Sequence, residues 1–236
     1  MTSASEIEED VSEYLQPAKL VNSDHPEIIE FAARLVGDAS DDIDKAIRLY
    51  NGVRDEVRYD PYNLTMDEAG LGALGCLRTG HGFCVQKAAL LAAAARASGI
   101  PARVGYADVR NHLTSKRLAE QMGGSDLFVY HGYTELYLEG KWVKATPVFN
   151  LSLCEKAKVA PLEFDGRNDS VFQPFNVEGA KHMEYIHDHG PFFDVPMETI
   201  IQAMNDAYPK LVDGLTTTDA ATAADFEADA ANYTED

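Results

Sequence analysis

The stretch GFCVQKAALLAAAARASGIPARV, residues 82–104, determines the core of the fold. From Cys84 to Ser98 almost every side chain is small or apolar, which predicts a helix that is buried on all sides. Gly99 ends this helix, and Pro101 prevents it from resuming because proline has no backbone N–H to donate. After Gly99 the pattern changes to that of strands.

Two segments with alternating side chains follow this helix and predict strands, residues 102–109 and 128–138. Glu139 and Gly140 predict a tight turn after the second strand. Residues 141–149 then return along it as the second arm of a hairpin. The downstream part of the core is therefore expected to be an antiparallel sheet.

Apolar residues at helical spacing mark further segments that start at Pro26, after Ser40 and within residues 196–211. Proline is favoured at the first position of a helix, and Ser23 or Asp24 can cap the helix that starts at Pro26. Because helices come first and an antiparallel sheet follows, the sequence predicts an α+β fold.

Composition limits the class of protein. The chain has 236 residues, of which 45% are hydrophobic and 25% charged, a balance typical of one large globular domain. Its net charge is −19, and twelve of those negative charges lie outside residues 17–210. Negative ends repel phosphate backbones, which argues against nucleic-acid binding. We expect no membrane association, because no apolar run approaches the roughly 18 residues of a membrane helix.

The distribution of charge and apolar residues divides the chain into three parts. We expect residues 1–19 to form an acidic N-terminal segment without a secretory signal and residues 20–212 to form a single domain. Residues 213–236 form an acidic tail that is expected to be solvated, because it has little apolar surface to bury. The alternative is that Phe226 and Tyr233 dock this tail across a cleft.

Cys84 has a special position among the three cysteines. Three scattered cysteines do not make a disulfide framework, so we expect a reducing, cytoplasmic location. Cys84 follows the loop formed by residues 80–83 and opens the alanine-rich helix. The unpaired N–H groups at a helix start lower the pKa of a thiol there and favour the thiolate. The alternative interpretation is a small buried cysteine that packs at the start of the helix.

A thiolate nucleophile needs a base, and His131 in the segment 128–138 is the candidate. If Glu139 and Gly140 form a two-residue turn, His131 lies opposite Val148. Thr146 and Asn150 are then its diagonal neighbours on the same face of the sheet. Either side chain could accept a hydrogen bond from the imidazole and orient it toward Cys84.

Two blocks of this sequence resemble the transglutaminase-like superfamily, whose members are related to the papain-like cysteine enzymes. The first block is residues 82–104, and the second is HGYTELYLEGKWV, residues 131–143. Val57-Arg58-Tyr59-Asp60 resembles the helix end that precedes this core. The resemblance covers residues 43–150 and implies a papain-like core in which the nucleophile helix packs on an antiparallel sheet.

The resemblance implies thiol acyl chemistry without a cofactor. A hydrolase or acyl transferase would form a thioester on Cys84, with His131 as base and the backbone N–H of Cys84 at the oxyanion. The family pattern has an aspartate where this chain has Thr146, which carries no charge. Asn150 is the first substitute to consider, and Asp165 is another. The alternative function is a catalytically degenerate protein that binds a peptide or protein partner.

Three further residues are predicted to contact a peptide or a small amide or ester substrate: His81, Gly82 and His187. His187 also lies near His189 and Glu184, which suggests a metal site. We predict no metal, because no second ligand cluster with recognisable spacing accompanies these residues. Residues 151–195 have no counterpart in the core family and are expected to form the rim of the substrate site.

Overall fold

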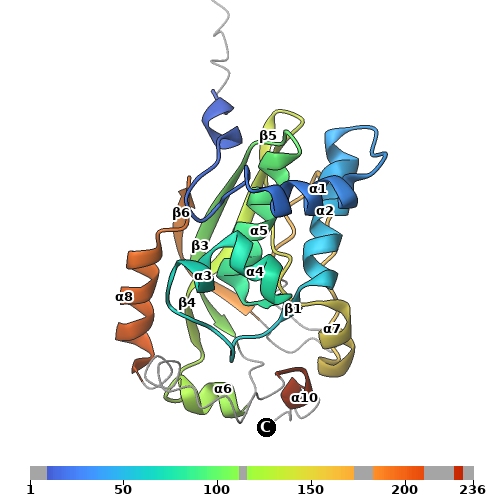
Figure 1. The fold of residues 1–236 in the computed structure, drawn as a ribbon. Helices are drawn as coiled ribbons and strands as arrows, with labels where there is room; N and C mark the ends of the chain where they lie inside the picture. Colours follow the sequence, from blue (N-terminus) through green and yellow to red (C-terminus); the bar gives the residue numbers. More distant parts are fainter. Residues whose placement is uncertain (1–9, 112–115, 173–182, 210–225, 231–236) are drawn as a thin grey trace, which may run out of the picture.

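The computed structural model describes residues 10–111, 116–172, 183–209 and 226–230. Its centre is helix α5 (Cys84–Ala97), which packs between an antiparallel sheet and a layer of other helices (Figure 1). That helical layer consists of α1 (Pro26–Val36), α2 (Asp42–Glu56) and α4 (Ala73–Thr79). The arrangement confirms the predicted α+β fold.

Helix α5 is buried on all sides, as its composition predicts. Every residue from Cys84 to Arg96 is buried, because alanine side chains let helices and strands approach closely. Gly99 ends the helix with a positive φ of 82°, a conformation that glycine adopts without strain. Thr134 of the sheet donates its hydroxyl to the carbonyl of Ala88 at 2.9 Å and ties sheet and helix together.

The sheet has four strands in the order β5-β4-β3-β6, and all neighbouring strands are antiparallel. The strands are β3 (Ala102–Asn111), β4 (Leu127–Leu138), β5 (Lys141–Ala145) and β6 (Met183–Phe192). Strand β6 comes from the region that was expected to form only a rim. That region therefore also supplies an edge strand of the central sheet.

The β4–β5 hairpin has the register that its turn predicts. Leu138 pairs with Lys141, and the pairing continues to Thr134 and Ala145. The turn residues Glu139 and Gly140 have φ values of 50° and 82°, the left-handed conformation that a two-residue hairpin requires. Strand β5 ends at Ala145 rather than at residue 149, and the ladder stops at Thr134. The expectation that His131 pairs opposite Val148 is therefore wrong, because Thr146 and Val148 lie beyond the hydrogen-bonded ladder.

The first helix begins at Pro26 as predicted, but its cap is different. His25 is the N-cap residue, and its Nδ1 accepts a hydrogen bond from the backbone N–H of Glu27 at 3.3 Å. The expectation that Ser23 or Asp24 caps this helix is therefore wrong. An imidazole with a free lone pair can serve the same purpose as a carboxylate or hydroxyl.

A fully buried lysine joins α5 to the end of α2. The ammonium group of Lys87 donates to the backbone carbonyls of Arg54 and Val57. These carbonyls lie at the C-terminal end of α2, where no further helical N–H can reach them. Burial lowers the pKa of Lys87 from 10.5 to about 7, because a charged group loses its hydration there.

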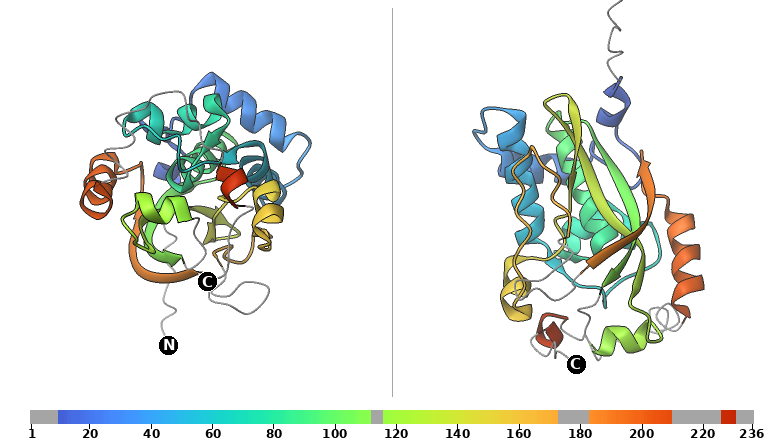
Figure 2. Two further views of the ribbon diagram at one scale, coloured as in Figure 1. Left: turned by 90° about the horizontal axis from the view of Figure 1, so that it is seen from below. Right: turned by 180° about the vertical axis from the view of Figure 1, so that it is seen from behind.

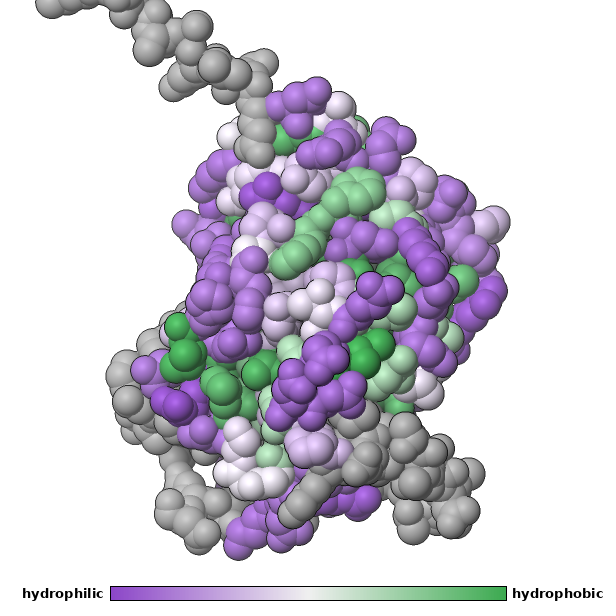
Figure 3. Space-filling view, turned by 90° about the vertical axis from the view of Figure 1, so that its left-hand side faces the viewer, coloured by the Kyte–Doolittle hydropathy of each residue, from purple (hydrophilic) through white to green (hydrophobic). Residues whose placement is uncertain are grey.

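The remaining elements surround this core. They are η1 (Ser12–Leu15), β1 (Arg58–Tyr59), α3 (Glu68–Leu71), β2 (His81–Gly82), α6 (Lys116–Gln121), α7 (Leu151–Ala157), α8 (Met197–Ala207) and α10 (Phe226–Ala230). On the face with β6 and α8, hydrophobic side chains form small separate groups among hydrophilic ones (Figure 3). Within the described ranges, no helix combines the length and apolar content needed to cross a membrane.

The segment 226–230 is docked rather than solvated. Phe226 is only 3% exposed, and α10 lies beside α7 (Figure 2). The expectation of a solvated tail is therefore wrong for Phe226 and Glu227, which are both buried, whereas docking of the tail across a cleft stays a prediction. Tyr233 lies outside the described residues. One aromatic side chain supplies enough apolar area to anchor an otherwise polar segment.

Candidate active site

Cys84 is the first residue of α5 and is held there by a short parallel pair of strands. Tyr59 of β1 pairs with Gly82 of β2, and the N–H of Asp60 donates to the carbonyl of Gly82 at 3.0 Å. The strand pair fixes the loop that leads into α5. Cys84 itself is 7% exposed. Its backbone N–H is one of the first in the helix and has no carbonyl acceptor within the helix.

Strand β4 approaches Cys84 closely at Gly132. A Cβ atom on Gly132 would lie 2.9 Å from the carbonyl oxygen of Cys84 and 3.0 Å from the Cα of Val85. Only glycine permits this approach. The backbone N–H of Gly132 acts to lower the pKa of the Cys84 thiol and so favours its thiolate form. His131 precedes Gly132, so the structure brings the backbone of the predicted base next to the predicted nucleophile.

Burial keeps both groups uncharged. It raises the pKa of the Cys84 thiol to about 11, although the N–H groups of Gly132, Val85 and Cys84 itself favour the thiolate. Burial also lowers the pKa of His131 from 6.5 to about 4. The expectation that the helix start gives Cys84 a low pKa is therefore wrong for this closed conformation, because desolvation outweighs the backbone hydrogen bonds.

His131 has aromatic rather than charged surroundings. Its ring is 3% exposed and lies 5.4 Å from the ring of Phe172, edge to face. Within the described part of the chain, its Nδ1 atom is buried without a hydrogen-bond partner, and so is the hydroxyl oxygen of Thr146. Thr146 therefore does not hydrogen-bond the imidazole of His131. This contradicts the prediction that Thr146 is one of the two side chains that could orient the imidazole.

Asn150 is committed to other contacts. Its Oδ1 accepts from the N–H of Tyr59 at 2.9 Å, and its Nδ2 donates to Ser152 and Glu227 at 2.7 Å each. The structure thus places Asn150 in the contact that holds α10, and no hydrogen bond joins its side chain to His131 among the described residues. This use of Asn150 had no signal in the sequence, because Glu227 is 77 residues away.

Asp165 is likewise not in the site. Its carboxylate accepts from the N–H groups of Arg167 and Asn168 at 2.8 Å each and closes an exposed turn. These hydrogen bonds lower its pKa to about 2. The third candidate for an orienting group is therefore occupied elsewhere.

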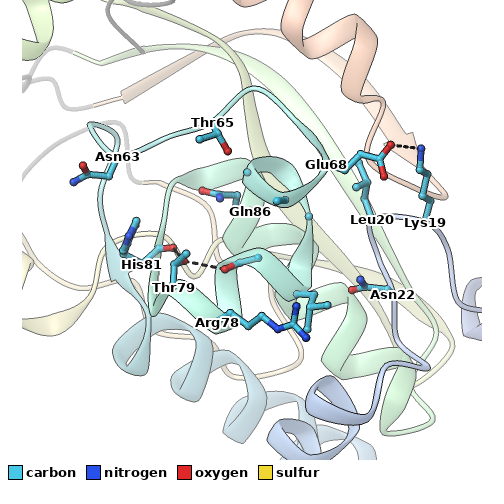
Figure 4. Close-up of a pocket in the computed structure, with 15 residues that line it drawn as sticks. Lys19, Leu20, Asn22, Asn63, Thr65, Glu68, Arg78, Thr79, His81 and Gln86 are labelled. Atoms are coloured by element: carbon cyan, nitrogen blue, oxygen red, sulfur yellow. Dashed lines mark hydrogen bonds and ion pairs between the residues drawn. The ribbon is translucent and has the colours of Figure 1, made fainter. Parts of the chain in front are cut away.

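His81 and Gly82 lie on β2, which leads into Cys84. His81 lines a pocket of about 430 Å³ together with Asn63, Arg78 and Gln86 (Figure 4). The Nδ1 atom of His81 is buried and has no hydrogen-bond partner in the described ranges. Neither Cys84 nor His131 lines this pocket. A substrate contact by His81 or Gly82 remains a prediction.

His187 lies on the edge strand β6, where it pairs with Asp108 of β3. Its side chain is exposed, and its ring lies 4.6 Å from that of His189. In the part of the chain that the structure describes, no three His, Cys, Asp or Glu side chains come together as a metal site would require. Strand β3 lies between β6 and β4, the strand that carries His131.

A cluster next to His131 was missed by the sequence analysis. His189 Nε2 lies 2.8 Å from Asp108 Oδ1, and the His189 ring stacks on Tyr130 at 4.0 Å. Asp108 also accepts the N–H of Tyr130, whose φ is 52°. Asp108 lies at irregularities in the β3–β4 and β3–β6 pairing, and such bulges re-aim neighbouring side chains. This cluster shapes β4 directly before His131.

An apolar cavity of about 40 Å³ lies near the start of α5, although neither Cys84 nor His131 lines it. Its walls include Phe83 and Val85, the two chain neighbours of Cys84, together with Tyr59, Phe128 and Tyr208. This cavity has no signal in the sequence, because its walls come from five separate parts of the chain.

Comparison with known proteins identifies the family of this arrangement. Residues 29–147 match the family model described as the transglutaminase-like superfamily. No curated protein matches the chain. Residues 29–147 contain Cys84, His131 and Thr146, whereas Asn150 lies just beyond them.

Three solved structures are similar to the chain, and it spans less than two thirds of each of them. A candidate cysteine protease from Cytophaga hutchinsonii has 16% identity and a TM-score of 0.47, with 80% of this chain and 57% of that chain covered. A candidate protease from Parabacteroides distasonis has 18% identity and a TM-score of 0.39, with 58% and 26% covered. The periplasmic domain of TgpA from Pseudomonas aeruginosa, bound to ethylmercury, has 23% identity and a TM-score of 0.39, with 57% and 46% covered.

Proposed function

The chain belongs to the transglutaminase-like superfamily, and from that premise we propose that it is a cysteine-dependent hydrolase or acyl transferase that acts on an amide or ester bond. The observation that carries this proposal is the approach of β4 to the start of α5. A Cβ atom built on Gly132 would lie 2.9 Å from the carbonyl oxygen of Cys84. His131 is the residue before Gly132. A cysteine at the start of a helix, packed against a strand that carries a histidine, is an arrangement suited to acyl transfer.

The reaction proceeds through a thioester. The sulfur of Cys84 forms a bond to the substrate carbonyl carbon while its proton passes to the imidazole of His131. The backbone N–H of Cys84 donates to the oxyanion that develops on the carbonyl oxygen. When the C–N or C–O bond breaks, the leaving amine or alcohol takes the proton from His131, and the acyl group stays on the sulfur.

The second half of the reaction decides between hydrolysis and transfer. His131 removes a proton from the incoming nucleophile, which attacks the thioester. The C–S bond then breaks, and the sulfur of Cys84 takes the proton from His131 and leaves as a thiol. Water gives a carboxylic acid, and an amine gives a new amide. We favour water as the acceptor, with a peptide or a small amide or ester as the substrate. The apolar cavity of about 40 Å³ near the start of α5 suits a small hydrophobic group on the acyl side.

The resting pair is thiol and imidazole rather than thiolate and imidazolium. Burial raises the pKa of Cys84 to about 11 and lowers that of His131 to about 4. Proton transfer from sulfur to nitrogen must therefore accompany the attack or follow an opening that hydrates the site. No carboxylate hydrogen-bonds His131 among the described residues, so the imidazolium has less stabilisation than an aspartate would provide.

The test is turnover of a panel of chromogenic esters and amides by the full chain. We expect activity in the unmodified protein and its loss in Cys84→Ala and His131→Ala. Cys154→Ala serves as the matched control, because Cys154 is a buried cysteine on α7 with no role in this mechanism. Equal turnover in the unmodified protein and in Cys84→Ala would contradict the proposal.

The second candidate function is binding without turnover. The unpartnered Nδ1 of His131 favours it, because an orienting partner is absent from the closed site in the described part of the chain. A degenerate protein would bind a peptide or a protein partner with the same affinity after Cys84→Ala and would turn over none of the esters or amides.

A cytoplasmic location is part of the proposal. All three cysteines are free, which is the expected state in a reducing compartment. Nucleic-acid binding is not expected, because the net charge of −19 would repel phosphate groups.

A further inference from the structure

Helix α10 inserts an aromatic ring between two tyrosines. The ring of Phe226 lies 5.3 Å from that of Tyr59 and 5.3 Å from that of Tyr62, edge to face in both cases. The side chain is 3% exposed, so the contact removes almost all of its apolar surface from water. The hydroxyl of Tyr62 also donates to the carboxylate of Asp229 at 3.0 Å.

The carboxylate of the next residue, Glu227, accepts hydrogen bonds from three side chains. Its Oε1 accepts from Asn150 Nδ2 at 2.7 Å and from Ser152 Oγ at 2.9 Å, and its Oε2 accepts from Lys156 Nζ at 2.7 Å. Burial acts to raise the pKa of Glu227. The hydrogen bonds from Lys156, Asn150 and Ser152 have the larger combined effect and lower this pKa from 4.5 to about 2. A cation and two neutral donors around one carboxylate constitute a specific carboxylate contact.

The surface under α10 is continuous with the candidate active site. Tyr59 pairs with Gly82, two residues before Cys84. On its other side Tyr59 lies 5.0 Å from Phe149, and Phe149 lies 5.2 Å from Phe172. Phe172 is the ring that packs edge to face against His131. Edge-to-face rings thus lead without interruption from Phe226 to His131.

We propose that five side chains form a peptide subsite that binds an aromatic residue followed by a glutamate, and these are Tyr59, Tyr62, Asn150, Ser152 and Lys156. Residues 226–230 occupy this subsite as a ligand of the same chain. The proposal rests on the proposed function, for which it names the substrate class: peptides that carry an aromatic–acidic pair. We call these five residues the aromatic–acidic subsite. Its location beside β1 puts a bound peptide against the strand pair that leads into Cys84.

The occupant is a tethered ligand, which sets what competition to expect. Residues 226–230 belong to the same chain as the subsite, so their binding is intramolecular and their effective concentration does not depend on the protein concentration. A free peptide must therefore compete with a ligand that is always present. Binding in trans becomes measurable when the internal ligand is weakened by substitution, while the subsite itself stays intact.

The experiment measures fluorescence polarisation of a labelled peptide with the sequence of residues 222–232. The receptor is the full chain with Phe226→Ala and Glu227→Gln, whose folding is checked by far-ultraviolet circular dichroism. We expect this receptor to bind the peptide about tenfold more tightly than the unsubstituted chain does. Lys156→Met in the same receptor should weaken binding about tenfold, and a peptide with alanine in place of the phenylalanine should bind as weakly.

Lys158→Met is the matched control, because Lys158 is an exposed lysine near Lys156 that has no part in the subsite. It should leave the affinity unchanged. A folded receptor that does not bind the peptide, or that binds a scrambled peptide equally well, would overturn the proposal.

Two measurements together separate this proposal from the proposed function: peptide binding to the receptor, with and without Cys84→Ala, and turnover of esters and amides by the parent protein. Peptide binding without any ester or amide turnover in the parent protein would contradict the enzyme and leave the subsite standing. Turnover without peptide binding would contradict the subsite alone.

Discussion

Cys84 and His131 are both uncharged in the closed site, and this state has a kinetic consequence. Only the thiolate reacts with iodoacetamide, so the alkylation rate of Cys84 should rise continuously with pH toward its pKa of about 11. A thiolate–imidazolium pair would instead give a rate that is constant from mildly acidic to neutral pH. Mass spectrometry of the Cys84 peptide after timed alkylation distinguishes the two, and a plateau around neutral pH would contradict the neutral pair.

Thr146 offers a second test at the scale of one side chain. Thr146→Asp would supply a carboxylate near the imidazole, raise the pKa of His131 and stabilise the imidazolium that forms during attack. We expect the neutral-pH alkylation rate of Cys84 to increase about tenfold. Thr146→Val should change it less than about twofold, because the Thr146 hydroxyl has no hydrogen-bond partner among the described residues. A decrease with Thr146→Asp in a folded protein would show that Thr146 does not face His131.

At the scale of elements, the contact between β4 and α5 depends on Gly132. Gly132→Ala would place a methyl group 2.9 Å from the Cys84 carbonyl oxygen, so strand and helix must move apart. We expect a loss of about 1–3 kcal/mol in the free energy of unfolding, together with loss of turnover. Urea unfolding and the ester assay measure the two effects.

Gly140→Ala is the control for this prediction. Gly140 has a φ of 82° in the hairpin turn, and nothing lies within 4 Å of its Cβ position. The variant should lose stability through backbone strain but keep its turnover. Full turnover in a folded Gly132→Ala protein would mean that the close approach is not needed for the reaction.

The junction between α2 and α5 should make stability depend on pH. The pKa of Lys87 is lowered from 10.5 to about 7 on folding, so between these values the unfolded chain binds a proton that the folded chain does not. The free energy of unfolding should therefore increase by about 1.4 kcal/mol for each pH unit between pH 7 and 10.5. Lys87→Met removes this dependence, whereas Lys158→Met keeps it. Parallel slopes for Lys87→Met and the unmodified protein would refute a neutral buried lysine.

The sequence predicted the elements with strong local patterns and missed the contacts that close the site. The alanine-rich segment from Cys84 to Ser98 and the turn at Glu139 and Gly140 each carry their own signal within a few residues. The commitment of Asn150 to Glu227 carries none, because the two are brought together only by the complete fold.

The same reason explains the error on Cys84. A helix start is visible in the sequence, but the desolvation that raises the pKa of the thiol depends on β4 and on the other surroundings of the site. Those surroundings come from parts of the chain that lie far from Cys84.

At the scale of the whole molecule, α5 lies against β4 at the centre of the fold, and α10 lies beside α7 at the lower end of the view in Figure 1. Cys84 starts α5, and the aromatic contacts from Phe226 lead to His131. The proposed acyl transfer to Cys84 would take place where these elements come together.

The most direct test of this central claim is to trap the acyl group. The full chain is incubated with a nitrophenyl ester, quenched in acid and digested, and the peptide that contains Cys84 is weighed by mass spectrometry. We predict an added acyl mass on Cys84 that hydroxylamine removes, as it does for a thioester, and that is strongly reduced in His131→Ala. An acyl mass that never appears on Cys84, or that appears equally in folded His131→Ala protein, would contradict the account.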